Sequence, residues 1–143
     1  MRKLKIFYLC ALSLLFLPAA FSLEKPPSVQ VSTILKTGTS WDGKPIEYPT
    51  GKAEVTGLVI EIPPGGETGW HQHPVPSFGM ILEGELEVKL KDGSVKRLKA
   101  GEALAEVTNT FHNGRNAGSG PLKLVVFYAG VAGQTLTVAE SKQ

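Results

Sequence analysis

The sequence predicts an all-β protein, and three observations support this fold class. From residue 29 onward the chain consists of short runs rich in β-branched and aromatic residues, many of which alternate apolar and polar positions. Clusters of glycine, proline and aspartate separate these runs. No stretch of the chain after residue 24 has the periodicity of an amphipathic helix. Short strands at this spacing are typical of a β-sandwich or β-barrel.

Residues 1–22 have the three-part layout of a secretory signal peptide. A basic cluster precedes an apolar run over residues 6–17, and small residues close the segment before an expected cleavage site after Ser22. The apolar run of about 12 residues is shorter than the ~20 residues that a membrane-spanning helix needs. We therefore expect export to the periplasm or the extracellular space, with no stable membrane association after cleavage.

Charge and cysteine content exclude several classes of function. The chain has 15 Lys and Arg against 13 Asp and Glu, and cleavage would remove three of the basic residues, which leaves 12 against 13. A nearly neutral protein with scattered lysines lacks the clustered basic surface of a nucleic-acid-binding protein. The only cysteine is Cys10, inside the predicted signal peptide. The mature chain is therefore expected to have no disulfide, no catalytic thiol and no cysteine-bound metal.

Six runs in the mature chain are predicted to be strands. Residues 24–28 carry two prolines and are expected to be extended, because proline disfavours helix at its own position and at the one before it. The predicted strands span residues 29–35, 53–62, 78–90, 94–100, 102–107 and 121–130. The domain organisation expected is a signal peptide (1–22), an N-terminal extension with a first strand (23–52), a β-barrel (53–131) and a C-terminal segment (132–143).

The clearest hairpin lies between residues 85 and 99. Over 85–90 apolar residues alternate with glutamate and lysine, so one face of the strand belongs to the core and the other to solvent. Asp92-Gly93 then supplies a tight turn, because glycine tolerates the positive φ angles that such turns require. Val95 and Leu98 are expected to return to the apolar pattern on the second strand.

The three histidines of the chain are the first candidates for a functional site. His71 and His73 are two residues apart, so their side chains point to the same side if the segment is extended. His112 would have to join them from another strand. Imidazole is the commonest metal ligand in proteins, although a histidine pair of this spacing alone is more often explained by a surface or core position.

The sequence around these histidines resembles the two signature motifs of the cupin family. The first motif reads G-x5-H-x-H-x3-E-x6-G and the second reads G-x5-P-x-G-x2-H-x3-N. The matching residues are Gly65, His71, His73 and Gly84 in the first motif and Gly101, His112 and Asn116 in the second. The similarity covers about residues 55–129. It implies a small single-domain jelly-roll β-barrel.

Three positions depart from the motifs. Ser77 stands where the first motif has its glutamate ligand, and Val107 and Asn109 replace the proline and glycine of the second. A serine hydroxyl is a poor ligand for a divalent ion. The resemblance therefore implies a metal held by three neutral imidazoles, whose site keeps a charge near +2 and favours an anionic group or hydroxide.

The resemblance implies a divalent transition metal bound by His71, His73 and His112. The ligand type does not distinguish Fe, Mn, Zn, Ni and Cu. Some three-histidine cupins are iron dioxygenases, so one implied function is a metal-dependent oxidoreductase that acts on a small molecule. The alternative is a cupin module that binds a small molecule or a metal without turnover. A homodimer that pairs through strands at the barrel edge is also expected.

Several further residues are candidates for the surroundings of the site. Glu106 lies six residues before His112 and is expected to be a proton-transfer group, a substitute ligand, or an outward-facing strand residue. Met80 and Phe111 are candidates for pocket contacts, together with Ser77. Asn116 is expected to serve as a hydrogen-bonding strut near the site.

Overall fold

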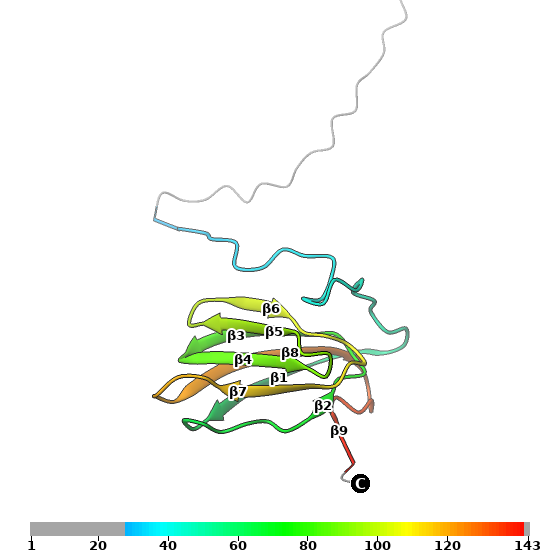
Figure 1. Cartoon of the computed structure of the whole chain (residues 1–143). Coiled ribbons are helices and arrows are strands. Elements are labelled where there is room, and N and C mark those ends of the chain that lie inside the picture. The colour runs from blue at the N-terminus through cyan, green and yellow to red at the C-terminus, as the bar shows by residue number, and fades with distance from the viewer. Residues whose placement is uncertain (1–27, 142–143) are drawn as a thin grey trace, which may run out of the picture. The chain divides into compact units, whose positions relative to one another are not determined.

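The computed structural model describes residues 28–141, so the predicted signal peptide and Cys10 lie outside the described residues. The described residues from Thr33 onward belong to one compact unit. Within the described range the regular structure consists of β-strands alone (Figure 1). No described segment is a helix of the length and apolar character needed to cross a bilayer.

The strands form two antiparallel sheets. The first sheet has the order β1 (Ala53–Ile62), β8 (Leu122–Val131), β3 (Ser77–Glu83) and β6 (Ala103–Ala105). The second has the order β5 (Val95–Lys99), β4 (Glu85–Leu90), β7 (His112–Asn116), β2 (His71–Gln72) and β9 (Val138–Ala139). Neighbours in each sheet are mostly distant in sequence, as in a jelly roll. The prediction of an all-β jelly-roll fold is confirmed.

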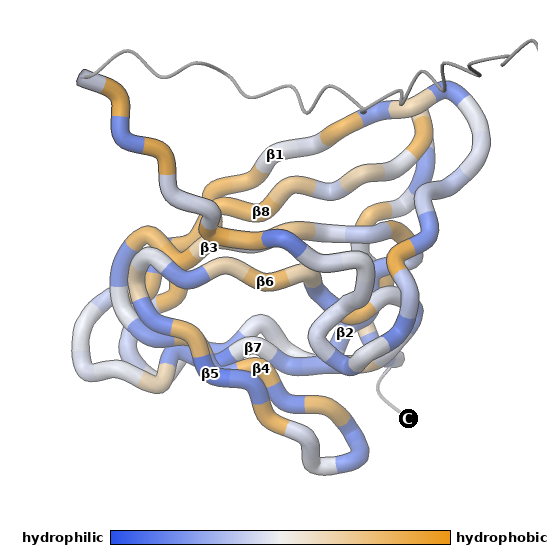
Figure 2. The backbone as a smooth tube through the Cα atoms, turned by 90° about the horizontal axis from the view of Figure 1, so that it is seen from above, coloured by the Kyte–Doolittle hydropathy of each residue, from blue (hydrophilic) through white to orange (hydrophobic). Residues whose placement is uncertain are grey.

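The core lies between the two sheets and follows from the alternation of side chains along the strands. On β8, Leu122, Leu124, Val126 and Tyr128 are buried, whereas Phe127 between them is 49% exposed. Figure 2 shows that hydrophobic residues concentrate along β1, β8, β3 and β6, whereas β7 is hydrophilic along much of its length. The first sheet therefore supplies much of the apolar wall of the barrel.

Two predicted runs are strands in the structure, and the second of them is interrupted once. Residues 53–62 form β1 as predicted. The run over 78–90 is divided by Gly84 into β3 and β4. Gly84 has a φ of +83°, and a Cβ at this position would lie 2.5 Å from the carbonyl oxygen of Pro121. Only glycine fits this turn without displacing backbone.

Other strand predictions need correction. Residues 29–35 form no strand, and their apolar side chains at Val29, Val31 and Ile34 are exposed. Val95 is 48% exposed whereas Leu98 is buried, because residues three apart on a strand lie on opposite faces. Three strands were not predicted at all, namely β2, β7 and β9. They are short or polar, and β9 lies in the C-terminal segment beyond the predicted barrel.

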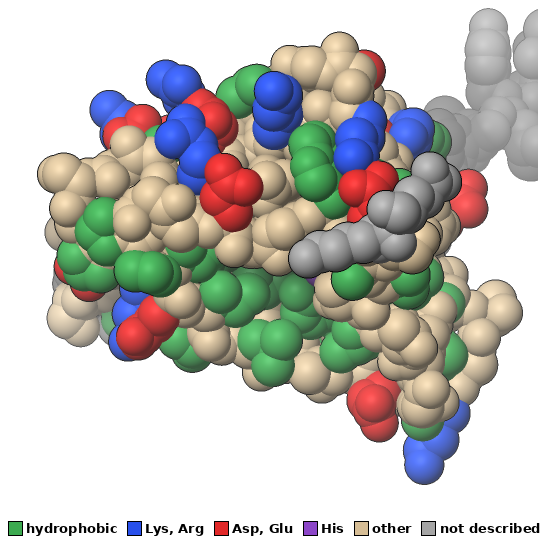
Figure 3. All heavy atoms as spheres, turned by 60° about the horizontal axis from the view of Figure 1, so that its bottom comes forward, with side chains coloured by type: hydrophobic (Ala, Val, Ile, Leu, Met, Phe, Trp, Pro, Cys, Tyr) green, Lys and Arg blue, Asp and Glu red, His purple; other side chains and the backbone are tan. Residues whose placement is uncertain are grey.

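The outer face of the first sheet carries exposed apolar side chains. Val55 and Val59 on β1 are 68% and 61% exposed, and Phe127 on β8 pairs with Gly57 in register. Figure 3 views the molecule from a different side, on which hydrophobic side chains gather in a band next to groups of charged side chains. The expected homodimer stays a prediction.

Candidate metal centre

The fold brings the three histidines together from two strands and a loop. His71 on β2 lies directly opposite His112 on β7 in the antiparallel register. His73 follows β2, and its carbonyl oxygen accepts a hydrogen bond of 2.8 Å from the backbone N–H of Asn109. The ring centroids are 4.4 to 5.0 Å apart. One ligand atom from each ring lies within 4.8 Å of the other two, so the cluster can hold a metal ion.

Asn109 keeps the turn that the second motif assigns to glycine. Its φ is +51°, the left-handed conformation, and asparagine adopts this conformation more readily than most residues with a side chain. The substitution of glycine by asparagine therefore preserves the backbone that supports His73.

Main-chain carbonyl oxygens orient all three imidazoles. Nδ1 of His71 lies 2.7 Å from the oxygen of Gly69, Nδ1 of His112 lies 2.9 Å from that of Thr110, and Nδ1 of His73 lies 2.9 Å from that of Leu136. A carbonyl oxygen can only accept, so each Nδ1 carries the proton. In the neutral rings Nε2 is then the nitrogen that can coordinate a metal.

Burial keeps two of the rings neutral at physiological pH. Burial, together with the neighbouring His112 and His71, lowers the pKa of His73 to about 4, although the hydrogen bond to the Leu136 carbonyl acts in the opposite direction. Burial also lowers the pKa of His71, although the Gly69 carbonyl and the charge of Glu106 act in the opposite direction. A neutral imidazole is the form that binds a metal. The donor set therefore fits a divalent transition metal.

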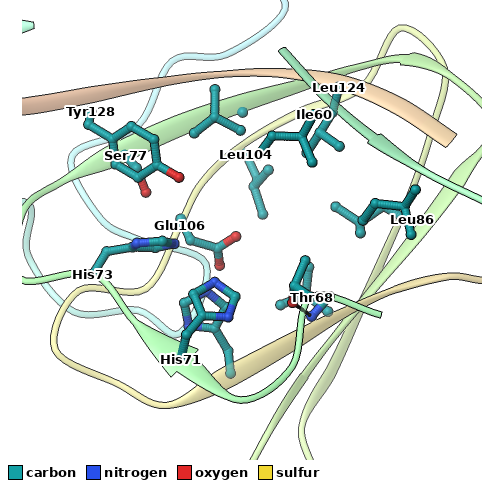
Figure 4. A pocket seen from close by; sticks show the side chains of 16 residues that line it. Ile60, Thr68, His71, His73, Ser77, Leu86, Leu104, Glu106, Leu124 and Tyr128 are labelled. Carbon is teal, nitrogen blue, oxygen red and sulfur yellow. Dashed lines mark hydrogen bonds between the residues drawn. The ribbon is translucent and has the colours of Figure 1, made fainter. Parts of the chain in front are cut away.

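Glu106 lies in the same cavity as the histidines, so of the orientations left open by the sequence it adopts the inward one. Its side chain lines the cavity with the histidines and does not face outward (Figure 4). Oε1 accepts hydrogen bonds from the indole Nε1 of Trp41 at 2.9 Å and from the backbone N–H of Val107 at 3.2 Å. The backbone N–H of Glu106 donates to the carbonyl oxygen of Ser77 at 2.9 Å. The carboxylate therefore enters the site from the residue that follows β6, next to the position where the motif has its glutamate.

Ser77 places a hydroxyl in the cavity. The residue is 1% exposed, and Oγ has no hydrogen-bond partner among the described residues. It lies opposite Tyr128 in the register of β3 with β8. Tyr128 is also buried, its ring meets that of His73 edge-on at 5.1 Å between centroids, and burial raises the pKa of its hydroxyl.

The cavity has a polar end and an apolar end. Its volume, counted as the space open to water-sized molecules, is about 60 Å³. We call His71, His73, His112 and Glu106 the polar end. The apolar end consists of the aliphatic side chains Ile60, Ile62, Leu86, Val88, Leu104, Leu124 and Val126. Figure 4 shows the two groups on opposite sides of the same space.

Two of the expected surrounding residues, Met80 and Phe111, do not line this cavity, so the expectation that they make pocket contacts is corrected. Met80 lies on β3 one residue from the inward-facing Gly79, so its side chain points to the other face of the sheet. Phe111 is likewise absent from the cavity wall. Asn116 is buried and acts as a strut away from the site: its Nδ2 donates to the carbonyl oxygens of Ile62 and Gly120.

Trp41 is a residue of the site that the sequence analysis missed. It belongs to the segment before β1 and reaches Glu106 across 65 positions of the chain. A single tryptophan in the polar, turn-rich stretch SWDGKP was the available signal, because such an aromatic residue is usually packed against something.

Comparison with known proteins agrees with this geometry. The family described as "Cupin domain" matches residues 58–128. The Oryzines biosynthesis cluster protein J of Aspergillus oryzae is 33% identical over 57 residues, which are 40% of this chain and 31% of that protein. The chain thus spans about a third of the fungal protein's length.

Two solved structures extend the comparison to the fold. A Klebsiella pneumoniae protein with a double-stranded β-helix domain aligns with a TM-score of 0.53 at 22% identity, covering 68% of this chain and 91% of that one. The DMSP lyase DddQ from Ruegeria pomeroyi aligns with a TM-score of 0.52 at 26% identity, covering 59% of this chain and 42% of that one. With both motifs, the jelly-roll fold and the family match in agreement, the chain belongs to the cupin superfamily.

Proposed function

We propose that the protein is an exported, metal-dependent enzyme that acts on a small, mostly apolar and uncharged molecule. His71, His73 and His112 would hold the divalent ion. The observation that carries the proposal is the meeting of three imidazoles, each oriented by a main-chain carbonyl, at the polar end of a mainly aliphatic cavity.

The cavity wall favours an uncharged substrate. The described lining residues include no lysine or arginine, and Glu106 is their only carboxylate. This carboxylate would offset part of the charge of a bound divalent ion, which weakens the expectation of an anionic substrate. The apolar end accommodates a hydrocarbon group, and the hydroxyls of Ser77 and Tyr128 can hydrogen-bond to a carbonyl or hydroxyl.

The residues at the polar end have distinct chemical tasks. A divalent ion held by the histidines would supply a Lewis acid or, if redox-active, a centre for oxygen activation. Glu106 would take a proton from the substrate at Oε2, because Oε1 is already occupied by two hydrogen bonds. The aliphatic wall would exclude water from the reacting groups.

A dioxygenase-like oxidoreductase is the first reaction class to test, since the implied ligands are three neutral histidines. The Ruegeria pomeroyi relative is a DMSP lyase, which supports small-molecule chemistry in a related barrel without selecting the same reaction. A cupin that binds its ligand without turnover is the competing outcome.

Metal content tests the centre directly. The chain from residue 23 onward would be stripped with chelator, reloaded in turn with Fe, Mn, Zn, Ni and Cu, and compared with a His73→Ala variant. We expect one ion per wild-type chain and a large loss in the variant. No stoichiometric metal in folded wild-type protein under any loading would refute the centre.

Turnover separates the two function classes. Metal-loaded protein would be incubated with small uncharged diketones, phenols and thioethers while oxygen consumption and products are followed. Oxygen consumption that requires His73 and Glu106 supports a dioxygenase, and product formation without oxygen consumption supports a lyase. Saturable binding with neither result supports a binding module and contradicts the enzyme proposal.

Export is the second part of the proposal and is supported by the layout of residues 1–22. N-terminal sequencing of the protein recovered from the periplasm or medium is expected to begin at Leu23. Recovery of the uncleaved chain from the cytoplasm alone would contradict it.

A further inference from the structure

The segment that precedes the family-matching residues contributes to the candidate metal centre. The family match begins at residue 58, yet the indole of Trp41 donates a 2.9 Å hydrogen bond to Oε1 of Glu106 inside the cavity. Trp41 also packs against the buried core cluster. The contact is therefore part of the packed structure of the barrel and not a surface encounter.

The backbone around Trp41 fixes where its ring can lie. Residues 40–44 close a tight turn through hydrogen bonds from the N–H of Ser40 to the carbonyl of Lys44 and from the N–H of Gly43 to the carbonyl of Ser40, both 2.9 Å. The N–H of Trp41 then donates to the carbonyl oxygen of Ala105 at 3.1 Å. This bond docks Trp41 beside the residue that precedes Glu106.

The hydrogen bonds to Glu106 leave its two oxygens in different situations. Oε1 accepts from both the Trp41 indole and the backbone N–H of Val107, whereas no hydrogen bond among the described residues ends at Oε2. Oε1 is therefore fixed by hydrogen bonds to the protein, and Oε2 is available to groups in the cavity. Figure 4 shows the carboxylate directed into the space beside His71 and His73.

The position of Glu106 also relates it to Ser77. Its backbone N–H is bonded to the carbonyl of Ser77, so the two residues are neighbours across β3 and the end of β6. Ser77 stands where the cupin motif has a carboxylate, and Glu106 brings a carboxylate to the same cavity from the position directly after β6.

We propose that Trp41 is a positioning residue that holds Glu106 with Oε2 facing the metal centre. Glu106 then supplies the negative charge that the motif's glutamate would bring at the position of Ser77. This inference rests on the metal centre proposed above. It makes the N-terminal segment a functional part of the site.

A double-mutant cycle on metal affinity tests the proposal. Trp41→Phe keeps an aromatic ring and removes the indole N–H, and Glu106→Gln keeps the side-chain volume and removes the charge. Co²⁺ affinity would be measured by chelator competition, with the visible absorption of bound Co²⁺ as a report on its surroundings. We expect Trp41→Phe to weaken Co²⁺ binding about 10-fold, as loss of an orienting partner of a metal site does.

The cycle gives opposite results for positioning and for general support. If Trp41 acts through Glu106, Trp41→Phe changes neither the affinity nor the Co²⁺ spectrum further in the Glu106→Gln background. Lys44→Met is the matched control, because it removes the contacts of Lys44 with Thr110 and Asp42 but leaves the indole in place. A loss from Lys44→Met equal to that from Trp41→Phe, or equal losses in both backgrounds, would overturn the proposal.

A measurement on metal-free protein keeps the contact testable if Trp41→Phe fails to fold. The chain has two tryptophans, so ¹H–¹⁵N spectra are expected to show two indole signals, with Trp70 as the internal reference. Glu106→Gln should shift the Trp41 indole signal and leave that of Trp70 in place; an unmoved Trp41 signal overturns the proposal. If wild-type protein binds no Co²⁺, the metal centre fails and this proposal with it, whereas binding that is indifferent to Trp41→Phe refutes the positioning role alone.

Discussion

The two ends of the cavity are built in different ways. At the polar end, main-chain carbonyls hold the rings of His71, His73 and His112, and an indole and a backbone N–H hold Glu106. At the apolar end, the shape depends on side-chain packing between the two sheets. The direction of the functional groups is thus set largely by backbone, whereas the volume of the cavity is set by side chains. We expect the two properties to respond to different mutations.

Leu86→Ala should give the largest effect at the apolar end. Leu86 is 4% exposed and belongs to both the core and the cavity wall. Its truncation is expected to lower the free energy of unfolding by ~2–5 kcal/mol, measured by urea denaturation. The Co²⁺ affinity of the folded variant should stay unchanged.

Leu82→Ala is the matched control for this truncation. Leu82 is 46% exposed, so the same change should alter the free energy of unfolding by no more than ~0.5 kcal/mol. A large loss of Co²⁺ affinity in the folded Leu86→Ala protein would show that the two ends are coupled and that the comparison is wrong.

Acid should lower the free energy of unfolding through His73 at the polar end, by less than the Leu86→Ala truncation does. The pKa of His73 is about 4 in the folded state against an ordinary value of 6.5. As the pH falls below 6.5, the unfolded chain takes up the proton first, so stability present above pH 6.5 is lost between pH 6.5 and 4. Because one pKa unit corresponds to about 1.4 kcal/mol, metal-free protein should lose ~2 kcal/mol between pH 7.5 and 5.

The contribution of His73 to this pH dependence can be isolated. Denaturation of metal-free His73→Gln at the same pH values should give a flatter profile than wild type, although the lowered pKa of His71 leaves part of the slope. Identical profiles for the two proteins would exclude His73 as the source.

Ser77→Ala should give the smallest effect. Because Ser77 Oγ is buried without a partner, its removal is expected to change the free energy of unfolding by less than ~1 kcal/mol. The change can be an increase, since a buried hydroxyl without a partner is itself destabilising. Ser40→Ala is the comparison, since the Ser40 hydroxyl donates to Asp42 and lies near the Lys44 carbonyl. Loss of this hydroxyl should lower the free energy of unfolding by ~1 kcal/mol. If thermal denaturation shows the greater loss for Ser77→Ala, then Ser77 has a partner in solution.

The sequence predicts the parts of the fold that depend on local pattern. Residues 53–62 and 121–130 are rich in β-branched and aromatic residues and are largely strand, and the hairpin turn at Asp92-Gly93 follows from the φ angle that glycine allows. β7 was missed because HNGRN is polar and contains glycine, so it has no strand pattern of its own. It is a strand because β4 on one side and His71 on the other pair with it.

In the candidate site, too, the features that follow from local sequence could be predicted and those that depend on distant contacts could not. Motif spacing is enough to group His71, His73 and His112, because it encodes the strand and turn lengths that bring them together. The direction of Glu106 was undecidable from sequence, since it depends on the pairing of that residue with Ser77. The part played by Trp41 depends on a contact across 65 positions, for which no local pattern exists.

The carbonyl partners of the histidines also bear on how this protein can change over evolutionary time. Gly69 has a φ of +77°, so a side chain there would strain the backbone. Replacing the side chain of Thr110 or Leu136, however, leaves the acceptor itself in place, because every amino acid carries the same carbonyl group. Point substitutions there are therefore tolerated as long as the backbone path is kept. Insertions, deletions and loss of the segment after residue 131 move the carbonyls themselves. The site is thus robust to drift in side chains and sensitive to changes in chain length.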